Sequence, residues 1–104
     1  MKDKFLQFLG IVKKSGNLVE GYNKCEEIIK SKKLFLIIIS KNCSSNTKEK
    51  FIRHCTNCSL PYVEAYASEE LGNAVGRDEI NILGVTNKNM SDNLILLLKE
   101  QSTI

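Results

Sequence analysis

Leu34-Phe35-Leu36-Ile37-Ile38-Ile39 is the stretch of this sequence that decides the fold. Six apolar residues in a row, rich in β-branched side chains, predict a β-strand that is covered on both faces, as in a parallel sheet. This run is the longest apolar stretch, and it is far too short to span a bilayer. The start of the chain also lacks the apolar segment and cleavage site of a signal peptide. We therefore expect a cytoplasmic protein without membrane contact.

Helical and strand patterns alternate on both sides of this run. The helices are expected at about residues 5–15, 22–32, 47–58, 69–75 and 91–99, and the other strands at 18–19, 62–66 and 80–85. No linker or repeat interrupts the pattern, so we expect one domain over residues 1–104. The alternation predicts an α/β domain with a mostly parallel four-stranded sheet and helices on both faces. Ligands bind such sheets along one edge, where the loops beginning at Gly21, Ser40 and Gly76 are candidates.

The charge is unevenly distributed along the chain. The formal total is +3, but residues 1–54 carry 12 basic and 5 acidic side chains, whereas residues 55–104 carry 3 and 7. This division favours one electropositive surface. Such a surface fits a polyanionic partner and a merely solvated lysine-rich face equally well.

The four cysteines and the single histidine do not form a convincing catalytic or metal site. Cys55 and Cys58 have C-x-x-C spacing, but they close a predicted helix, where the dipole opposes a thiolate. A zinc ion would need two more ligands, and no second C-x-x-C is present. His54 and Cys58 share a helix face but lack a third, orienting residue. We therefore expect buried structural thiols, no metal, no cofactor, no small-molecule substrate and no enzymatic activity.

The segment that opens the second predicted helix is the best candidate for a binding site. Gly21 enters the helix, and Asn23 and Lys24 lie in its first turn. Free backbone N–H groups at a helix start attract phosphate. An amide side chain can read base edges, and a lysine can reach phosphate or guanine. A simpler interpretation is equally physical, in which Gly21 only makes a turn and Asn23 only caps the helix.

Several short motifs occur in an order that resembles one known family. The motifs are Ser15-Gly16, Gly21-Tyr22-Asn23, Asn46-Thr47-Lys48, Pro61-Tyr62 and Glu70-Leu71-Gly72-Asn73-Ala74-Val75-Gly76. Together they resemble the kink-turn RNA-binding ribosomal proteins of the L-seven-Ae and L-thirty-e type, above all the short bacterial branch, over about residues 5–98. The resemblance implies a three-layer α/β/α sandwich whose four-stranded sheet is mixed rather than mostly parallel. It also implies a ribonucleoprotein component that binds structured RNA, kink-turn-like or ribosomal.

The resemblance also implies which residues contact RNA. In the family, the segment that opens the second helix contacts sheared G·A pairs through the major groove, and Gly21 and Asn23 match that segment. The expected RNA-binding residues are Gly21, Tyr22, Asn23, Lys24, Glu27, Lys41, Arg77 and Asp78. Lys24 stands where archaeal members often have Glu, and Glu27 stands where the family has Lys. A carboxylate facing phosphates would remove on the order of 1 kcal/mol of binding free energy.

These departures leave a second function open. The same fold could be a protein-interaction module in which the RNA site is degraded. Glu27 supports this alternative, as does the apolar run from Leu94 to Leu98, where Leu96 is expected to be exposed.

Overall fold

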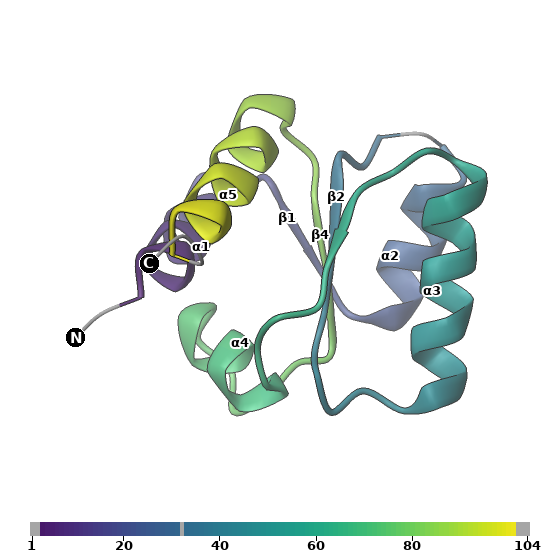
Figure 1. The fold of residues 1–104 in the computed structure, drawn as a ribbon, viewed down its shortest axis with the longest axis horizontal. Helices are drawn as coiled ribbons and strands as arrows, with labels where there is room; N and C mark the ends of the chain where they lie inside the picture. The colour runs from purple at the N-terminus through teal and green to yellow at the C-terminus, as the bar shows by residue number, and fades with distance from the viewer. Residues whose placement is uncertain (1–2, 32, 102–104) are drawn as a thin grey trace.

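The computed structural model describes residues 3–31 and 33–101, so the predicted end of the second helix at Lys32 lies outside the described residues. Helices and strands alternate along these residues (Figure 1). The helices are α1 (Lys4–Lys14), α2 (Tyr22–Ile29), α3 (Ser45–Asn57), α4 (Ser68–Ala74) and α5 (Lys88–Gln101). The strands are β1 (Leu18–Glu20), β2 (Leu36–Ile39), β3 (Tyr62–Val63) and β4 (Ile82–Val85).

The four strands form one mixed sheet in the order β1-β4-β2-β3. β2 and β3 are parallel, whereas β4 is antiparallel to both of its neighbours. The mostly parallel sheet predicted from the alternating pattern is therefore wrong, and the mixed sheet implied by the family resemblance is confirmed. The reason is the length of α4, whose seven residues span only about 10 Å. Such a short helix does not carry the chain back along the length of the strands. β4 therefore starts at the end of the sheet where β3 finishes, and it runs in the opposite direction.

Two helical layers cover the two faces of the sheet (Figure 1). α1, α4 and α5 lie on one face, and α2 and α3 lie on the other. The central strand β2 supplies both cores, because Leu36 and Ile38 pack in the first layer while Ile37 and Ile39 pack in the second. Each of these four side chains is fully buried. This confirms the prediction of a strand covered on both faces, and it follows from the two-residue period of the pleat.

A local cap begins α3, whereas a tertiary contact holds the start of α4. α3 follows an N-cap at Ser44, whose hydroxyl accepts from the backbone N–H of Thr47. α4 follows an N-cap at Ala67, whose side chain offers no hydrogen bond. Ser68 is buried, and its backbone N–H donates to Asn42 Oδ1 at 2.8 Å. This bond ties the start of α4 to the loop between β2 and α3.

Two glycines bring α4 and the loop after it into close contact. A Cβ atom added at Gly72 would lie 2.5 Å from Glu79 Cα, so only glycine fits there. Gly76 has a φ of +81°, in the left-handed region that favours glycine. The backbone N–H of Arg77 then donates to Gly72 O at 2.8 Å. These glycines thus fix the course of the loop that carries Arg77.

Candidate nucleic-acid interface

Three loops meet at one edge of the sheet: the turn at Gly21, the loop at 40–44 and the loop at 75–81. The backbone N–H of Gly21 donates to Ile82 O at 2.9 Å, and that of Ser40 donates to Asn81 O at 2.9 Å. Ser40 Oγ also donates to Asn81 Oδ1 at 2.6 Å. The structure therefore brings together the loops that begin at Gly21, Ser40 and Gly76, as the sequence predicted.

A hollow of about 380 Å³ lies between these loops. The residues that line it are Gly21, Tyr22, Cys43, Ser44, Thr47, Arg77, Ile80, Asn81 and Ile82. Hydroxyl, amide and guanidinium groups thus border apolar side chains in one small space. Only Gly21, Tyr22 and Arg77 of these were predicted site residues. The other six were not, among them the polar residues Ser44, Thr47 and Asn81.

The N-terminus of α2 is open beside this hollow. Gly21 is its N-cap, with a φ of +102°, and no side chain caps the first turn. The backbone N–H groups of that turn are therefore available to an anion. Asn23 and Lys24 are exposed, and their side chains make no hydrogen bond or ion pair with the rest of the described chain. The simpler interpretation of Asn23 as a helix cap is therefore wrong.

Tyr22 holds α2 against α3. Its ring packs edge-on against Phe51, with the ring centroids 5.3 Å apart, and its hydroxyl accepts a hydrogen bond from Lys50 Nζ at 2.5 Å. Lys50 also forms an ion pair with Glu26. The hydrogen bonds to Glu26 and Tyr22 raise the pKa of Lys50. Tyr22 thus presents only part of its ring to the hollow, because its other contacts belong to the packing of the two helices.

Arg77 is held by an acidic residue that sequence reasoning missed. Arg77 Nε donates to Glu20 Oε1 at 2.5 Å, and the other oxygen of Glu20 pairs with Lys13. Burial raises the pKa of the Glu20 carboxyl, but the hydrogen bonds and charges of Lys13 and Arg77 outweigh it, so the pKa lies below its usual value. No local motif could reveal this cluster, because Glu20 and Arg77 are 57 residues apart in the sequence.

The other predicted site residues are exposed around the same edge. Glu27 lies on α2 between the buried Cys25 and Ile29, and therefore on the opposite, outer face of the helix. Its carboxylate forms no ion pair within the part of the chain that the structure describes. Lys41 and Asp78 are exposed in the second and third loops. All eight predicted residues therefore lie on the three converging loops or on α2.

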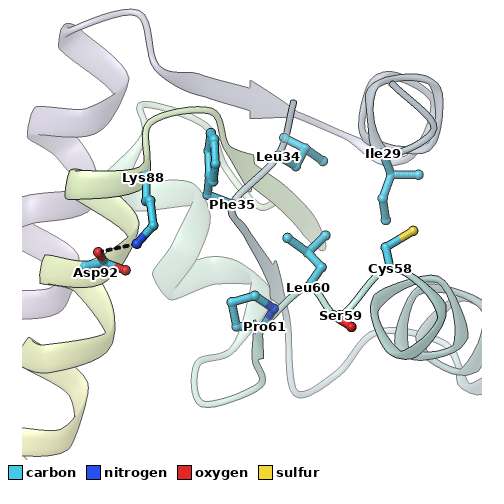
Figure 2. Close-up of a pocket in the computed structure, with 9 residues that line it drawn as sticks. All are labelled: Ile29, Leu34, Phe35, Cys58, Ser59, Leu60, Pro61, Lys88 and Asp92. Carbon is cyan, nitrogen blue, oxygen red and sulfur yellow. Dashed lines mark hydrogen bonds and ion pairs between the residues drawn. The ribbon is translucent and has the colours of Figure 1, made fainter. Parts of the chain in front are cut away.

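A second hollow, of about 320 Å³, lies at the opposite edge of the sheet (Figure 2). Its lining residues are Ile29, Leu34, Phe35, Cys58, Ser59, Leu60, Pro61, Lys88 and Asp92. Lys88 and Asp92 form an ion pair of 3.0 Å beside it. None of the eight predicted RNA-binding residues lines this hollow.

The cysteines do not gather into a reactive or metal-binding cluster. Cys55 is buried, as predicted, and burial raises the pKa of its thiol to about 11. Cys58 is exposed at the end of α3, so the prediction of burial is wrong for this residue. Within residues 3–31 and 33–101, no three His, Cys, Asp or Glu side chains are placed to hold a metal ion. The same residues contain no helix long and apolar enough to cross a membrane.

The layers and the converging loops define a class of protein: a three-layer α/β/α sandwich with its candidate binding site at one edge of a mixed sheet. The chain belongs to the ribosomal protein L7Ae/L30e/S12e/Gadd45 family, which it matches over residues 3–96. Family membership confirms the resemblance noted in the sequence.

Individual relatives agree with this assignment. The RNA-binding protein YlxQ of Bacillus subtilis is 24% identical over 95 residues, which are 91% of this chain and 95% of YlxQ. A protein with unknown function from Bacillus halodurans has a structure with a TM-score of 0.91 and 24% identity, covering 94% of this chain and 99% of that one. The 15.5kD RNA binding protein of Giardia lamblia has a TM-score of 0.76 and 13% identity, covering 96% and 89%. The two structures confirm the fold.

Proposed function

We propose that this chain is a non-enzymatic, cytoplasmic RNA-binding protein that recognises kink-turn or related internal-loop RNA through the Gly21 loop and the N-terminus of α2. The observation that carries the proposal is the uncapped first turn of α2, where the side chains of Asn23 and Lys24 are exposed and have no partner among the described residues. Membership of the L7Ae family and the likeness to YlxQ support RNA as the polyanion.

Each group at this edge has a chemical counterpart in RNA. The free N–H groups of α2 suit a phosphate. The amide of Asn23 can exchange hydrogen bonds with a base edge that an internal loop exposes, and Lys24 can reach a phosphate or a guanine. The mixed polar and apolar lining of the adjacent hollow suits an unstacked base.

The charges around the site determine how binding should respond to salt. Lys24 and Lys41 are exposed cations on the converging segments, and Glu27 opposes them. Each phosphate that a cation neutralises releases counterions, so the affinity should fall steeply as salt rises. Binding that is insensitive to salt would contradict this part of the proposal.

The decisive experiment titrates the protein with a kink-turn RNA and with a copy in which Watson–Crick pairs replace the sheared G·A pairs. We expect tighter binding to the kink-turn RNA at low salt. Equal affinity for the two RNAs would remove kink-turn recognition and leave general RNA binding. If neither RNA binds at low salt, the proposal is wrong, and the alternative of a protein-interaction module becomes the better account of the fold.

A further inference from the structure

Glu20 joins three segments that border the candidate interface. It is the last residue of β1 and directly precedes Gly21. One carboxylate oxygen accepts from Nε of Arg77 at 2.5 Å, and the other pairs with Lys13 at the end of α1. One side chain therefore links α1, the entrance to α2 and the loop that follows α4.

The two cations of this cluster face solvent, whereas the carboxylate is shielded. The exposed fractions of the side chains are 43% for Lys13 and 54% for Arg77, but only 11% for Glu20. The lowered pKa keeps Glu20 ionised at neutral pH. The cluster thus carries a net charge of one rather than two beside the loops that would meet RNA.

We propose that Glu20 is a specificity-determining residue, which restrains Lys13 and Arg77 from binding RNA phosphates indiscriminately. This inference rests on the proposed function. Phosphate contacts carry affinity but no sequence information, and they account for nearly all non-specific binding. The contacts of α2 fix the position of the recognised RNA, whereas a non-specific complex can reorient until its phosphates lie against both freed cations. Glu20 therefore lowers the affinity for unspecific RNA more than the affinity for the recognised RNA.

The test compares Glu20→Gln with the wild type, using the kink-turn RNA and its G·A-disrupted copy. At 0.1 M salt, we expect the affinity for the disrupted copy to rise roughly tenfold, with a salt dependence steeper by up to about 1.8 in log–log slope for two new phosphate contacts. The affinity for the kink-turn RNA should rise less. An equal rise for both RNAs, no change, or weaker binding would each overturn the inference.

Asp92→Asn is the matched control, because it removes the same charge and frees Lys88 at the opposite edge of the sheet. It should leave both affinities within twofold of the wild type. Thermal unfolding shows whether Glu20→Gln still folds. If it does not fold, Glu20→Asp replaces it, because the shorter carboxylate holds the two cations less well and keeps the charge. The affinity for the disrupted copy should again rise more than that for the kink-turn RNA. No change, or an equal rise for both RNAs, would contradict the inference.

A third polyanion separates this inference from the proposed function. A single-stranded DNA oligonucleotide offers phosphates without a kink-turn. If the wild type binds no RNA but Glu20→Gln gains affinity for the oligonucleotide, the proposed function fails while the restraint by Glu20 stands. If the wild type prefers the kink-turn RNA and Glu20→Gln changes nothing, only the role of Glu20 fails.

Discussion

Asn23 is the residue on which the proposed recognition depends most directly. Its amide is exposed in the uncapped first turn of α2 and has no partner within the described chain. We expect Asn23→Ala to weaken kink-turn binding by about 1–3 kcal/mol, since a base-edge contact is lost. The binding titration measures this loss, and the melting temperature should stay the same because no intramolecular bond is removed.

Asn89→Ala is the control for this prediction. Asn89 is also exposed in the first turn of a helix, but α5 begins at the opposite edge of the sheet. This variant should bind RNA like the wild type. If Asn23→Ala does so too, the site has been assigned to the wrong residues.

Glu27 gives a prediction of the opposite sign. Its carboxylate lies on the outer face of α2, forms no ion pair with the described residues, and repels phosphates near that helix. We therefore expect Glu27→Lys to strengthen RNA binding by roughly 1 kcal/mol, about fivefold in affinity. Glu49→Lys makes the same charge change on the exposed face of α3 and should have a smaller effect. Equal gains for the two variants would mean that only the total charge matters.

The sequence revealed part of the candidate site and concealed the rest for a physical reason. Gly21 and Asn23 could be recognised as candidate site residues because both lie at the start of one helix, where a short sequence pattern is enough to identify them. The ion pairs of Glu20 with Lys13 and Arg77 could not be predicted, because the fold alone brings these three residues together. The contacts of Tyr22 with Phe51 and Lys50 of α3 likewise depend on the fold and leave no local pattern in the sequence.

At the scale of elements, the contact between α4 and the loop after it can be tested at Gly72. A Cβ atom there would meet Glu79 backbone at 2.5 Å, so α4 and the loop would have to separate. We expect Gly72→Ala to lower the free energy of unfolding by about 1–3 kcal/mol, as overpacking does. Urea denaturation measures the change. Asn73→Ala, one residue further along the exposed side of α4, should change it by less than about 0.5 kcal/mol.

α4 also explains why the direction of β4 could not be predicted from the sequence. The type and order of the elements could be predicted, since apolar periodicity distinguishes helices from the buried strand β2. The direction of β4 could not, because periodicity carries no information about which edge of the sheet a strand enters. That direction depends on the length of α4 and on the tether between Ser68 and Asn42.

At the scale of the whole molecule, the two layers predict how its thiols react. Cys25, Cys43 and Cys55 are buried and Cys58 is exposed. Burial also raises the pKa of Cys25 to about 12, which leaves almost no thiolate at pH 8. We expect iodoacetamide to modify one thiol quickly in the native protein and four after denaturation, as counted by mass spectrometry.

Alkylation of Cys58 should leave RNA binding unchanged, because this residue lies at the edge opposite to the N-terminus of α2. Rapid modification of more than one thiol in the native state would contradict the packing of α2 and α3. A loss of RNA binding on alkylation would contradict the placement of the interface.

The basic character of the first half of the chain is partly neutralised within the fold. Three of its cations pair with carboxylates: Lys13 with Glu20, Lys50 with Glu26, and Lys48 with Glu64. Glu20 also pairs with Arg77 of the second half. The sequence-based expectation of one electropositive surface did not include these pairs. Lys24 and Lys41 are exposed and have no such ion pair among the described residues.

This pairing has a consequence for the rate of encounter between protein and RNA. Long-range steering needs a broad field of one sign, whereas the opposite charges of an ion pair largely cancel each other's field. Salt at physiological concentration screens what remains beyond about 8–10 Å. The association rate constant should therefore stay near the unsteered range of about 10⁵–10⁶ M⁻¹s⁻¹. Most of the salt dependence of the affinity should then come from the dissociation rate constant. Stopped-flow measurements at several ionic strengths would determine both rate constants.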